Sequence, residues 1–299
     1  MKRLALLLAL LLLLGACAAP EAEPSPSPRA TAAPLMTRST PRPTPEPAPE
    51  PTPEPPPAMS EDGEHPLLIA HGGGAVYGYR LTNSLEALDH AYEGGFRFIE
   101  LDFERTGDGE IVLIHDWESM AARLLGAAGQ RSLRLFRSAP ALAGLTLLDL
   151  GGLLRWMEEH PDCQIVTDIK SEDNLAMLSE IREKAGDDWT RFIPQAYSFE
   201  EAEALLDEGW ERVILTLYRI TVSPAELEGF LDETPLWAVT MSESRISEEL
   251  AAAVAASGSA LYCHSVNTLD FVDAWRDKGL TGIYTDYFEP KHWVSSELG

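Results

Sequence analysis

Cysteine is scarce in this sequence of 299 residues, which has three, and only Cys163 and Cys263 lie beyond residue 17. Two cysteines that are 100 residues apart cannot form the disulfide framework with which small secreted domains replace a large core. Each of them borders an apolar segment of the kind that forms a buried strand. We therefore expect two buried thiols in a domain that is stabilised by its hydrophobic core.

Basic side chains are also in the minority. The chain has 23 Lys and Arg against 48 Asp and Glu, which gives a formal net charge of −25, and the residues before position 66 contribute only −3 of it. A surface with this excess of negative charge repels polyanions. The composition therefore argues against nucleic acid and anionic lipid as general partners.

Large apolar side chains are almost absent from residues 18–65, where Pro, Glu, Thr and Ala dominate, as in TPRPTPEPAPEPTPEPPP. Such a segment has too little apolar surface to form a core. Alternating prolines favour an extended polyproline helix that rises ~3.1 Å per residue. We expect residues 18–65 to be a semi-rigid linker that holds a folded domain away from its attachment point.

The long apolar run of the chain is at its amino terminus, MKRLALLLALLLLLGACAAP. Lys2 and Arg3 precede this run, which ends at small residues and is too short for a spanning helix, as in an export signal. Its last four residues, ending at Cys17, resemble a bacterial lipobox, in which the cysteine is lipidated after cleavage. We predict a signal peptide over residues 1–17, lipidation of Cys17 and an extracytoplasmic protein anchored to the cell membrane. Plain secretion is the alternative.

Residues 66–299 contain no further low-complexity segment and no evident repeat, and their length suits one large domain. Segments with amphipathic helical patterns separate most of eight β-rich runs, which are residues 67–70, 96–103, 164–169, 191–196, 212–217, 235–240, 260–264 and 282–286. This alternation predicts an α/β fold with a parallel sheet, and eight such units predict a (β/α)8 TIM barrel over residues 66–299. An open doubly wound sheet is the main alternative, but the HGGG turn after the first run lacks the dinucleotide-binding spacing.

The longest interruption of this alternation runs from Gly107 to Pro161. It begins with a sequence typical of a hairpin, TGDGEIVLIHD, continues through an irregular piece over residues 123–140, and ends in the helical pattern LTLLDLGGLLRWMEEH. We interpret it as an insertion between the second and third barrel strands that lies over the barrel mouth.

Three carboxylates follow neighbouring predicted strands. Side chains in a strand alternate, so Glu100 and Asp102 share one side, and Asp168 holds the matching position in the next strand. At the carboxyl end of a barrel this side faces the axis, where three carboxylates repel one another unless a cation lies between them. Oxygen ligands suit Mg²⁺ or Ca²⁺ better than zinc. The alternative is that these residues cap helices or pair with Lys170.

Two histidines are placed for proton transfer. His71 follows the first strand, and His115 ends the predicted hairpin directly before Asp116. An imidazole has an unperturbed pKa of about 6.5, so both of its protonation states exist at neutral pH. Two such groups beside a metal suit the cleavage of a phosphodiester. Asp116 either orients His115 or caps a turn, and Lys170 either binds an anionic oxygen or forms a salt bridge at the rim.

Together these motifs resemble the glycerophosphodiester phosphodiesterase family, within the phospholipase C-like phosphodiesterases. The resemblance covers residues 67–286 and is carried by His71-Gly72, Asn83 before a helix, Glu100-Leu-Asp102 followed by TGDGEIVLIHD, Asp168-Ile-Lys170, ALYCHSVNT and GIYTD. It implies a (β/α)8 barrel that hydrolyses a small phosphodiester.

The resemblance also implies roles for individual residues. Glu100, Asp102 and Asp168 would bind one divalent cation, Ca²⁺ or Mg²⁺. His71 and His115 would be the acid and base, and Lys170 and Asn83 would contact the substrate.

Three positions depart from the pattern of the family. Gly72 and Thr82 stand where the family usually has Arg and Glu, and Asp168 replaces the usual Glu. Arg80, Arg105 and Arg219 are candidates to replace the missing guanidinium. Two alternatives to hydrolysis therefore remain: a cyclising phospholipid lyase like the sphingomyelinase D enzymes, and a tethered protein that binds phosphodiesters without cleaving them.

Overall fold

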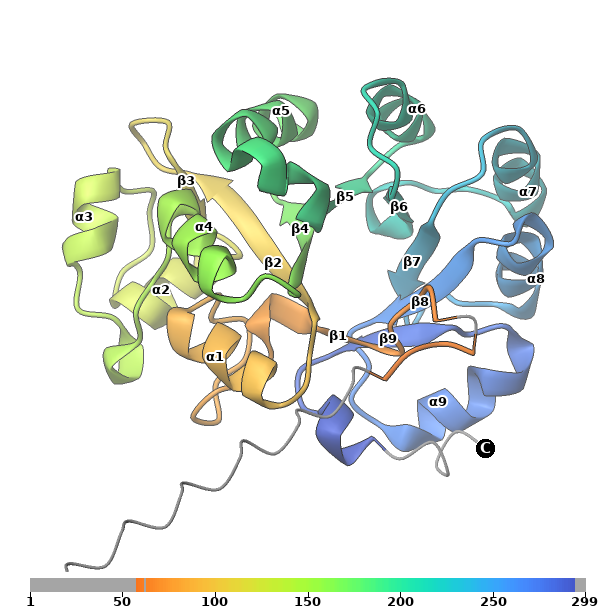
Figure 1. Ribbon diagram of the computed structural model, residues 1–299, viewed down its shortest axis with the longest axis horizontal. Helices are drawn as coiled ribbons and strands as arrows, with labels where there is room; N and C mark the ends of the chain where they lie inside the picture. Colours follow the sequence, from red (N-terminus) through yellow and green to blue (C-terminus); the bar gives the residue numbers. More distant parts are fainter. Residues whose placement is uncertain (1–57, 62, 294–299) are drawn as a thin grey trace, which may run out of the picture. The chain divides into compact units, whose positions relative to one another are not determined.

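The computed structural model describes residues 58–61 and 63–293. In this part of the chain one sheet contains β1 (Leu68–Ala70), β2 (Phe98–Arg105), β3 (Ile111–Leu113), β4 (Gln164–Ile169), β5 (Phe192–Ala196), β6 (Ile214–Thr216), β7 (Ala238–Ser242), β8 (Ala260–His264) and β9 (Gly282–Thr285) (Figure 1). The strands pair in the order β1-β9-β8-β7-β6-β5-β4-β2-β3, and a pairing of β1 with β2 closes eight parallel strands into a barrel. The predicted (β/α)8 barrel is confirmed.

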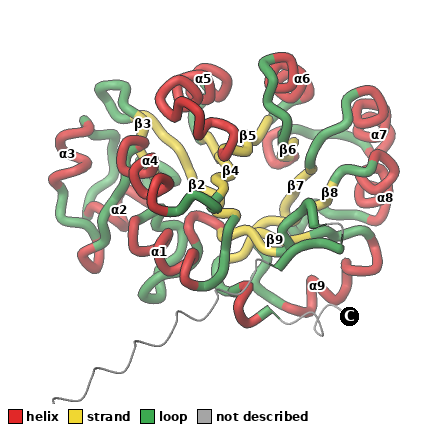
Figure 2. The backbone as a smooth tube through the Cα atoms, in the orientation of Figure 1, coloured by secondary structure: helices red, strands yellow, loops and turns green. Residues whose placement is uncertain are grey.

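Helices surround the barrel and connect its strands (Figure 2). They are α1 (Leu85–Glu93), α4 (Leu150–Glu159), α5 (Asn174–Ala185), α6 (Phe199–Asp207), α7 (Pro224–Glu233), α8 (Glu248–Ser257) and α9 (Leu269–Trp275). Four of them begin after a serine whose hydroxyl accepts a backbone N–H of the first turn, namely Ser84, Ser198, Ser223 and Ser247. These caps satisfy donors that a helix cannot satisfy internally, so the helices begin where the serines lie.

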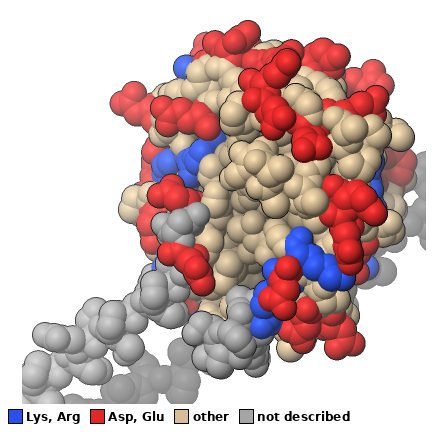
Figure 3. Space-filling view, turned by 90° about the vertical axis from the view of Figure 1, so that its right-hand side faces the viewer, with Lys and Arg blue, Asp and Glu red and all other residues tan. Residues whose placement is uncertain are grey.

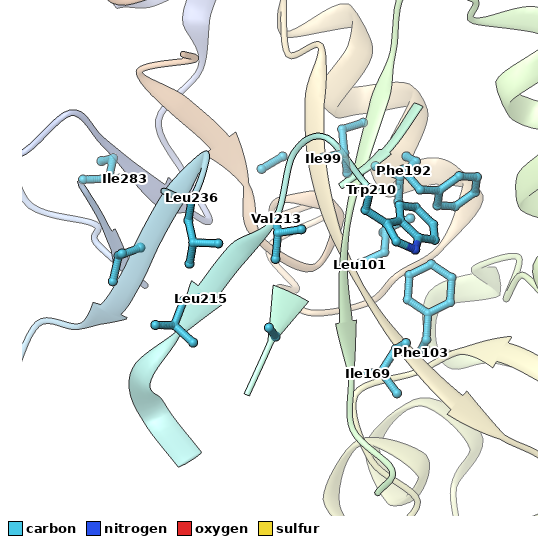
Figure 4. Packing of buried hydrophobic residues seen from close by; sticks show 14 of the residues in the cluster. Ile99, Leu101, Phe103, Ile169, Phe192, Trp210, Val213, Leu215, Leu236 and Ile283 are labelled. Atoms are coloured by element: carbon cyan, nitrogen blue, oxygen red, sulfur yellow. The ribbon is translucent and has the colours of Figure 1, made fainter. Parts of the chain in front are cut away.

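Alternation along the strands creates two apolar layers. Outward residues such as Ile99, Leu101 and Phe103 pack beneath the helices (Figure 4). Inward residues fill the barrel, namely Ile69, Phe98, Val166, Ile193, Ile214, Ala238, Ala260, Tyr262 and Tyr284. The side chains that follow these inward residues toward the carboxyl ends of the strands are polar, and they form the site described below.

The insertion between the second and third barrel strands is present and has a core of its own. Strand β3 pairs antiparallel with β2, as the predicted hairpin requires, and α2 (Ser119–Leu125) and α3 (Leu133–Ser138) follow. Trp117, Leu124 and Phe136 belong to a hydrophobic cluster separate from the main core. The insertion ends earlier than we expected, because α4 is the barrel helix that leads to β4.

The linker boundary expected at residue 66 lies within a packed segment. Met59 forms a β-bridge with Pro66 and contacts the apolar cluster inside the barrel. The ring centroid of His65 lies 4.9 Å from that of Trp237. The described residues before position 66 therefore pack against the barrel. The signal segment, Cys17 and residues 18–57 lie outside the described residues.

The two cysteines and the surface charge have the character that the composition predicts. Cys163 and Cys263 are buried and not paired with each other, as expected. Acidic side chains are spread over the face that carries α7 and α8, around an uncharged area and beside a smaller basic group (Figure 3). Among the residues that the structure describes, no helix has the length and apolar character needed to cross a bilayer.

Candidate active site

The barrel strands direct their inward polar side chains into one cavity of about 290 Å³. His71 comes two residues after the inward residue Ile69. Glu100 and Asp102 come two and four residues after the inward residue Phe98, so they share its side of the strand. The carboxyl ends of parallel barrel strands meet at one face, so side chains distant in sequence come together there. The cavity is lined by His71, Glu100, His115, Asp168, Lys170, Gln195, Tyr218, His264, Ser265 and Tyr284.

The three predicted carboxylates lie together. Asp102 and Asp168 are paired in register across β2 and β4, and Glu100 precedes Asp102 by two residues on the same face. One oxygen of each carboxylate lies within 4.8 Å of the other two, and all three residues are buried. This arrangement agrees with the predicted metal site.

Glu100 has an oxygen that a bound cation could contact. Its Oε2 accepts a hydrogen bond of 2.7 Å from the backbone N–H of Gly72, whereas its buried Oε1 has no hydrogen-bond partner. Burial and the charge of Asp102 raise the pKa of Glu100 to about 8. An unpaired buried carboxylate oxygen is costly unless a positive group faces it. The donor set therefore fits a hard cation such as Ca²⁺ or Mg²⁺.

Lys170 neutralises only part of the carboxylate charge. Its Nζ lies 2.6 Å from Asp168 Oδ2 and 2.9 Å from Asp102 Oδ1, so it forms the salt bridge and also lines the cavity. Burial opposes the charge on Lys170, but Asp102 and Asp168 raise its pKa above the usual value. If all three carboxylates are ionised, two negative charges are left beside the Lys170 ammonium, and one divalent cation would balance them.

Asp168 is held by groups that the sequence analysis did not identify. Its Oδ1 accepts hydrogen bonds from the hydroxyls of Tyr197, at 2.6 Å, and Tyr218, at 2.9 Å. Burial opposes ionisation, but Lys170 and these hydroxyls lower the pKa of Asp168 to about 2. Tyr197 follows β5 and Tyr218 follows β6, and only the closed barrel brings them to β4.

Asn83, which the family resemblance places in contact with substrate, binds Asp102 in the structure. Its side chain is fully buried, and its Nδ2 donates to Asp102 Oδ2 at 2.8 Å while its Oδ1 accepts from the Asp102 backbone N–H at 2.9 Å. Both ends of the amide are therefore occupied by Asp102, and the residue does not line the cavity. Asn83 therefore orients a carboxylate of the cluster, and its contact with substrate stays a prediction.

His71 is oriented by a carboxylate from the other end of the sequence. Its Nδ1 lies 2.9 Å from Asp286 Oδ1, and Asn267 Nδ2 donates to the other oxygen of Asp286 at 2.8 Å. Ser265 Oγ lies 3.0 Å from His71 Nδ1 and 3.1 Å from Nε2. Burial opposes protonation, but Asp286 and the charge of Glu100 raise the pKa of His71. The contact with Asp286 leaves Nε2 as the ring nitrogen for chemistry.

His115 has an equivalent partner within its own loop. Its Nδ1 lies 2.9 Å from Asp116 Oδ2. The other oxygen of Asp116 accepts the backbone N–H groups of Glu118, Ser119 and Met120, at the start of α2. Asp116 thus performs both of the roles that the sequence left open, because it orients His115 and caps the turn. The insertion places His115 in the cavity opposite the barrel strands.

A third histidine, His264, also lines the cavity and was not predicted as a site residue. Its Nδ1 lies 3.0 Å from Thr240 Oγ1, and its ring is edge-on to those of Tyr218 and Tyr284. Burial lowers the pKa of His264 to about 4. Its imidazole is therefore neutral at neutral pH. With Gln195 and Ser265 it gives the cavity an uncharged polar wall.

The structure explains why glycine follows His71. Gly72 has φ of +54°, and a Cβ at this position would lie 2.8 Å from Cα and Cδ2 of Leu81. A larger side chain does not fit unless Leu81 moves. One of the three candidate arginines is engaged elsewhere, because Arg105 binds Asp173 and Glu180.

The other two candidate arginines lie nearer the site. Arg219 donates to the backbone oxygen of Ile169 and stacks on the ring of Tyr197 at 3.8 Å. Arg80 lies at the rim, half exposed, with Nη1 3.4 Å from Asp286 Oδ2. None of the three candidates is among the side chains that line the cavity.

Comparison with known proteins finds similarity to one family over part of the chain. Residues 72–189 match the model of the "Glycerophosphoryl diester phosphodiesterase family". A curated Mycobacterium tuberculosis protein, "Probable glycerophosphodiester phosphodiesterase 2", is 32% identical over 133 residues, which are 41% of this chain and 49% of that protein. The chain thus spans about half the length of this relative. The residues that match the family model include Glu100, Asp102 and Asp168.

Solved structures give the same fold. An Oleispira antarctica phosphodiesterase in complex with the product sn-glycerol-3-phosphate has a TM-score of 0.61 at 15% identity, covering 78% of this chain and 96% of that one. A glycerophosphodiester phosphodiesterase from Thermotoga maritima has a TM-score of 0.58 at 20% identity, covering 74% and 95%. At these identities the similarity supports the barrel fold alone.

Proposed function

We infer that the chain belongs to the glycerophosphoryl diester phosphodiesterase family and propose that it hydrolyses a small glycerophosphodiester. One observation carries this proposal. Glu100, Asp102 and Asp168 form one buried carboxylate cluster in the cavity that His71 and His115 also line. A carboxylate cluster that could hold a cation beside two imidazoles suits phosphodiester cleavage.

The two histidines are proposed to move protons at Nε2. Each ring uses Nδ1 to contact a carboxylate, Asp286 for His71 and Asp116 for His115. One Nε2 accepts the proton of the attacking water, and the other donates a proton to the alkoxide that leaves phosphorus. Phosphorus gains the water oxygen and loses the alcohol oxygen, so the products are an alcohol and a phosphate monoester.

Glu100, Asp102 and Asp168 are proposed to hold one Ca²⁺ or Mg²⁺ ion. When bound, such an ion neutralises phosphoryl oxygens and stabilises the charge that develops on them. Lys170 adds a further positive group on the wall of the cavity and keeps Asp102 and Asp168 oriented. Asn83 fixes the rotamer of Asp102 through its two hydrogen bonds.

The substrate class is proposed from the site and from a structural relative. The Oleispira antarctica phosphodiesterase binds the product sn-glycerol-3-phosphate. Here the uncharged wall formed by Gln195, His264 and Ser265 offers hydrogen bonds to hydroxyl groups. A cavity of about 290 Å³ accommodates a phosphoryl group with a small polyol.

We further propose that the enzyme is an extracytoplasmic lipoprotein anchored to the cell membrane through lipidated Cys17. The charged start, apolar run and small residues of positions 1–17 support this proposal, and residues 18–57 supply the spacer. Mass spectrometry of the protein from membranes tests it. Acyl chains on Cys17 are expected, and a free Cys17 in the mature protein would contradict the proposal.

The activity is tested by following glycerophosphocholine with the full chain by ³¹P NMR in water enriched in ¹⁸O. We expect a glycerol phosphate that carries ¹⁸O, and loss of turnover in His71→Ala and His115→Ala. A cyclic phosphate as the end product would instead indicate the lyase. Binding of the diester without turnover would indicate a binding protein.

A further inference from the structure

Two arginines belong to the segments that carry the proposed catalytic histidines. Arg80 lies in the loop that follows His71. Arg123 lies on α2, whose first turn Asp116 caps directly after His115. Neither arginine is among the side chains that line the cavity. Both guanidinium groups are therefore outside the cavity, on segments that reach it.

Arg80 is joined to His71 through one carboxylate. Its Nη1 lies 3.4 Å from Asp286 Oδ2, and Oδ1 of the same carboxylate lies 2.9 Å from His71 Nδ1. The side chain of Arg80 is 53% exposed, whereas that of Asp286 is fully buried. The guanidinium of Arg80 therefore lies at the mouth of the cavity, beside the position of His71, and solvent reaches it.

Arg123 extends from the insertion to the same loop. Its Nη1 donates to the backbone oxygen of Arg80 at 3.5 Å, and its guanidinium lies 5.5 Å from the ring centroid of Tyr79. Its other contact is with Met120 Sδ, at 4.0 Å. Arg123 is exposed. Within the described ranges its partners are a carbonyl, an aromatic ring and a thioether, and none of these neutralises its charge.

Few carboxylates near these arginines are available to them. Residues 71–85 and 119–148 contain no Asp or Glu. Carboxylates that border the two segments have other partners, namely Glu86 with Thr146, Asp116 with His115, and Asp149 with Arg137. Glu118 is exposed, and in the part of the chain that the structure describes it forms no ion pair with either arginine. The two guanidinium groups thus share one carboxylate, Asp286, which also holds His71.

We propose that Arg80 and Arg123 form an anion subsite at the mouth, which selects glycerophosphodiesters whose second alcohol carries a negatively charged group such as a carboxylate. The cavity of about 290 Å³ accommodates the phosphoryl group and a small polyol, so the other alcohol extends past the mouth. Guanidinium groups bind carboxylates through charge-assisted hydrogen bonds in a fork geometry. The subsite rests on the proposed phosphodiesterase function, and it recognises a group other than the phosphate that reacts.

Two soluble diesters that differ by one carboxylate test the subsite. The full chain is assayed on glycerophosphoserine and on glycerophosphoethanolamine, and the ratio of the two kcat/KM values is the readout. We expect the unchanged chain to favour glycerophosphoserine roughly three- to tenfold at low salt, as for a charge-assisted contact at an exposed site. Added salt screens exposed charges and is expected to reduce this ratio. A preference that salt does not weaken would contradict the subsite.

Arg123→Gln removes one guanidinium and is expected to lower the ratio to about one to two. This change is preferred to one at Arg80, because Arg80 also contacts the carboxylate that orients His71. Arg134→Gln is the matched control, because it removes an exposed arginine from α3 of the same insertion, and its ratio is expected to equal that of the unchanged chain. A ratio near one in the unchanged chain would overturn the proposal, as would equal ratios for the Arg123 and Arg134 variants.

Equilibrium binding separates the subsite from the proposed activity. Titration calorimetry with glycerophosphoserine compares the full chain carrying His115→Ala, in which turnover is expected to be lost, with the same chain carrying Arg123→Gln as well. We expect the second variant to bind roughly threefold or more weakly. Weaker binding together with no hydrolysis of either diester by the unchanged chain would retain the subsite and remove the phosphodiesterase. Equal affinities would overturn the subsite even if both diesters are hydrolysed.

Discussion

Each catalytic imidazole of the proposed mechanism has a carboxylate that fixes its orientation. Asp286 contacts Nδ1 of His71, and Asp116 contacts Nδ1 of His115. Such a contact selects the tautomer and holds the ring in one orientation. The two carboxylates differ in origin, because Asp116 is the next residue after its histidine and Asp286 comes from the last barrel strand.

The contact with Asp286 is expected to matter for turnover. Asp286→Asn keeps the shape of the side chain and removes its charge, so the Nδ1 contact of His71 loses its ionic partner. We expect kcat on glycerophosphocholine to fall roughly 10- to 100-fold with little change in KM, as for other groups that orient a reacting residue. Steady-state kinetics measure both constants.

Asp162→Asn is the control for this variant. Asp162 also accepts bonds from side chains, those of Tyr92 and Arg97, but at a position away from the cavity. Its kcat is expected to be unchanged. An Asp286→Asn enzyme with full kcat would show that His71 does not need this carboxylate.

The close packing at Gly72 predicts a difference between two glycines. Gly72→Ala adds a Cβ at 2.8 Å from Leu81 in a left-handed conformation, whereas Gly78 has φ of +80° and no atom within 4 Å of the added Cβ. Both substitutions cost about 1–2 kcal/mol for the left-handed backbone, and Gly72→Ala costs a further ~1–3 kcal/mol for the steric contact. Urea unfolding measures both. Equal losses of stability would mean that Leu81 moves aside freely.

At the scale of strands and helices, the alternation of side chains determined most of what was predictable. Inward polar residues after inward apolar ones gave Glu100, Asp102 and Asp168 their shared face, and β4 and β8 have the predicted bounds. The predicted fifth run, residues 212–217, extended one residue too far, because β6 ends at Thr216 and Leu217 begins a 3-10 turn. Turns of this kind depend on the surrounding packing more than on the local sequence.

The outward layer of the barrel predicts a large effect of one core substitution. Phe103 is fully buried on β2, between the barrel and its helices (Figure 4). Phe103→Ala is expected to lower the free energy of unfolding by ~3–5 kcal/mol, because a large cavity forms in a packed layer. Urea unfolding of Leu135→Ala, an exposed position on α3, serves as the control. If Phe103→Ala lowers the free energy of unfolding no more than Leu135→Ala does, the assignment of Phe103 to the core is contradicted.

At the scale of the whole molecule, the side-chain contacts that the sequence did not predict are those between residues that meet only when the barrel closes. His71 and Asp286 are 215 residues apart and meet because β1 pairs with β9. Thr240 and His264 meet across β7 and β8. The contact of Asn83 with substrate was expected from the family resemblance alone, and the closed barrel also brings its amide to Asp102. Local patterns identify which residues lie at the mouth, but the partner of each depends on the closed barrel.

His264 links stability to pH. Its pKa is lowered from 6.5 to about 4 by burial, with Asp168 acting in the opposite sense and His71 and Lys170 in the same sense. Between these values the unfolded chain binds a proton that the folded chain does not, so this contribution to stability is complete above pH 6.5 and is lost as pH falls toward 4.

A variant without this imidazole isolates the contribution. From about pH 8 to about pH 4.5, the difference in unfolding free energy between the unchanged chain and His264→Gln is expected to shrink by ~1–3 kcal/mol. Urea unfolding at a series of pH values measures it. A difference that stays constant with pH would show that His264 titrates normally.

The proposed activity depends on a cation held by Glu100, Asp102 and Asp168. The most direct test is the hydrolysis of glycerophosphocholine by the full chain before chelation, after chelation, and after Ca²⁺ or Mg²⁺ is restored. We predict that turnover disappears with the chelator and returns with at least one of the two ions, whereas turnover that continues unchanged in excess chelator would contradict the metal-dependent phosphodiesterase.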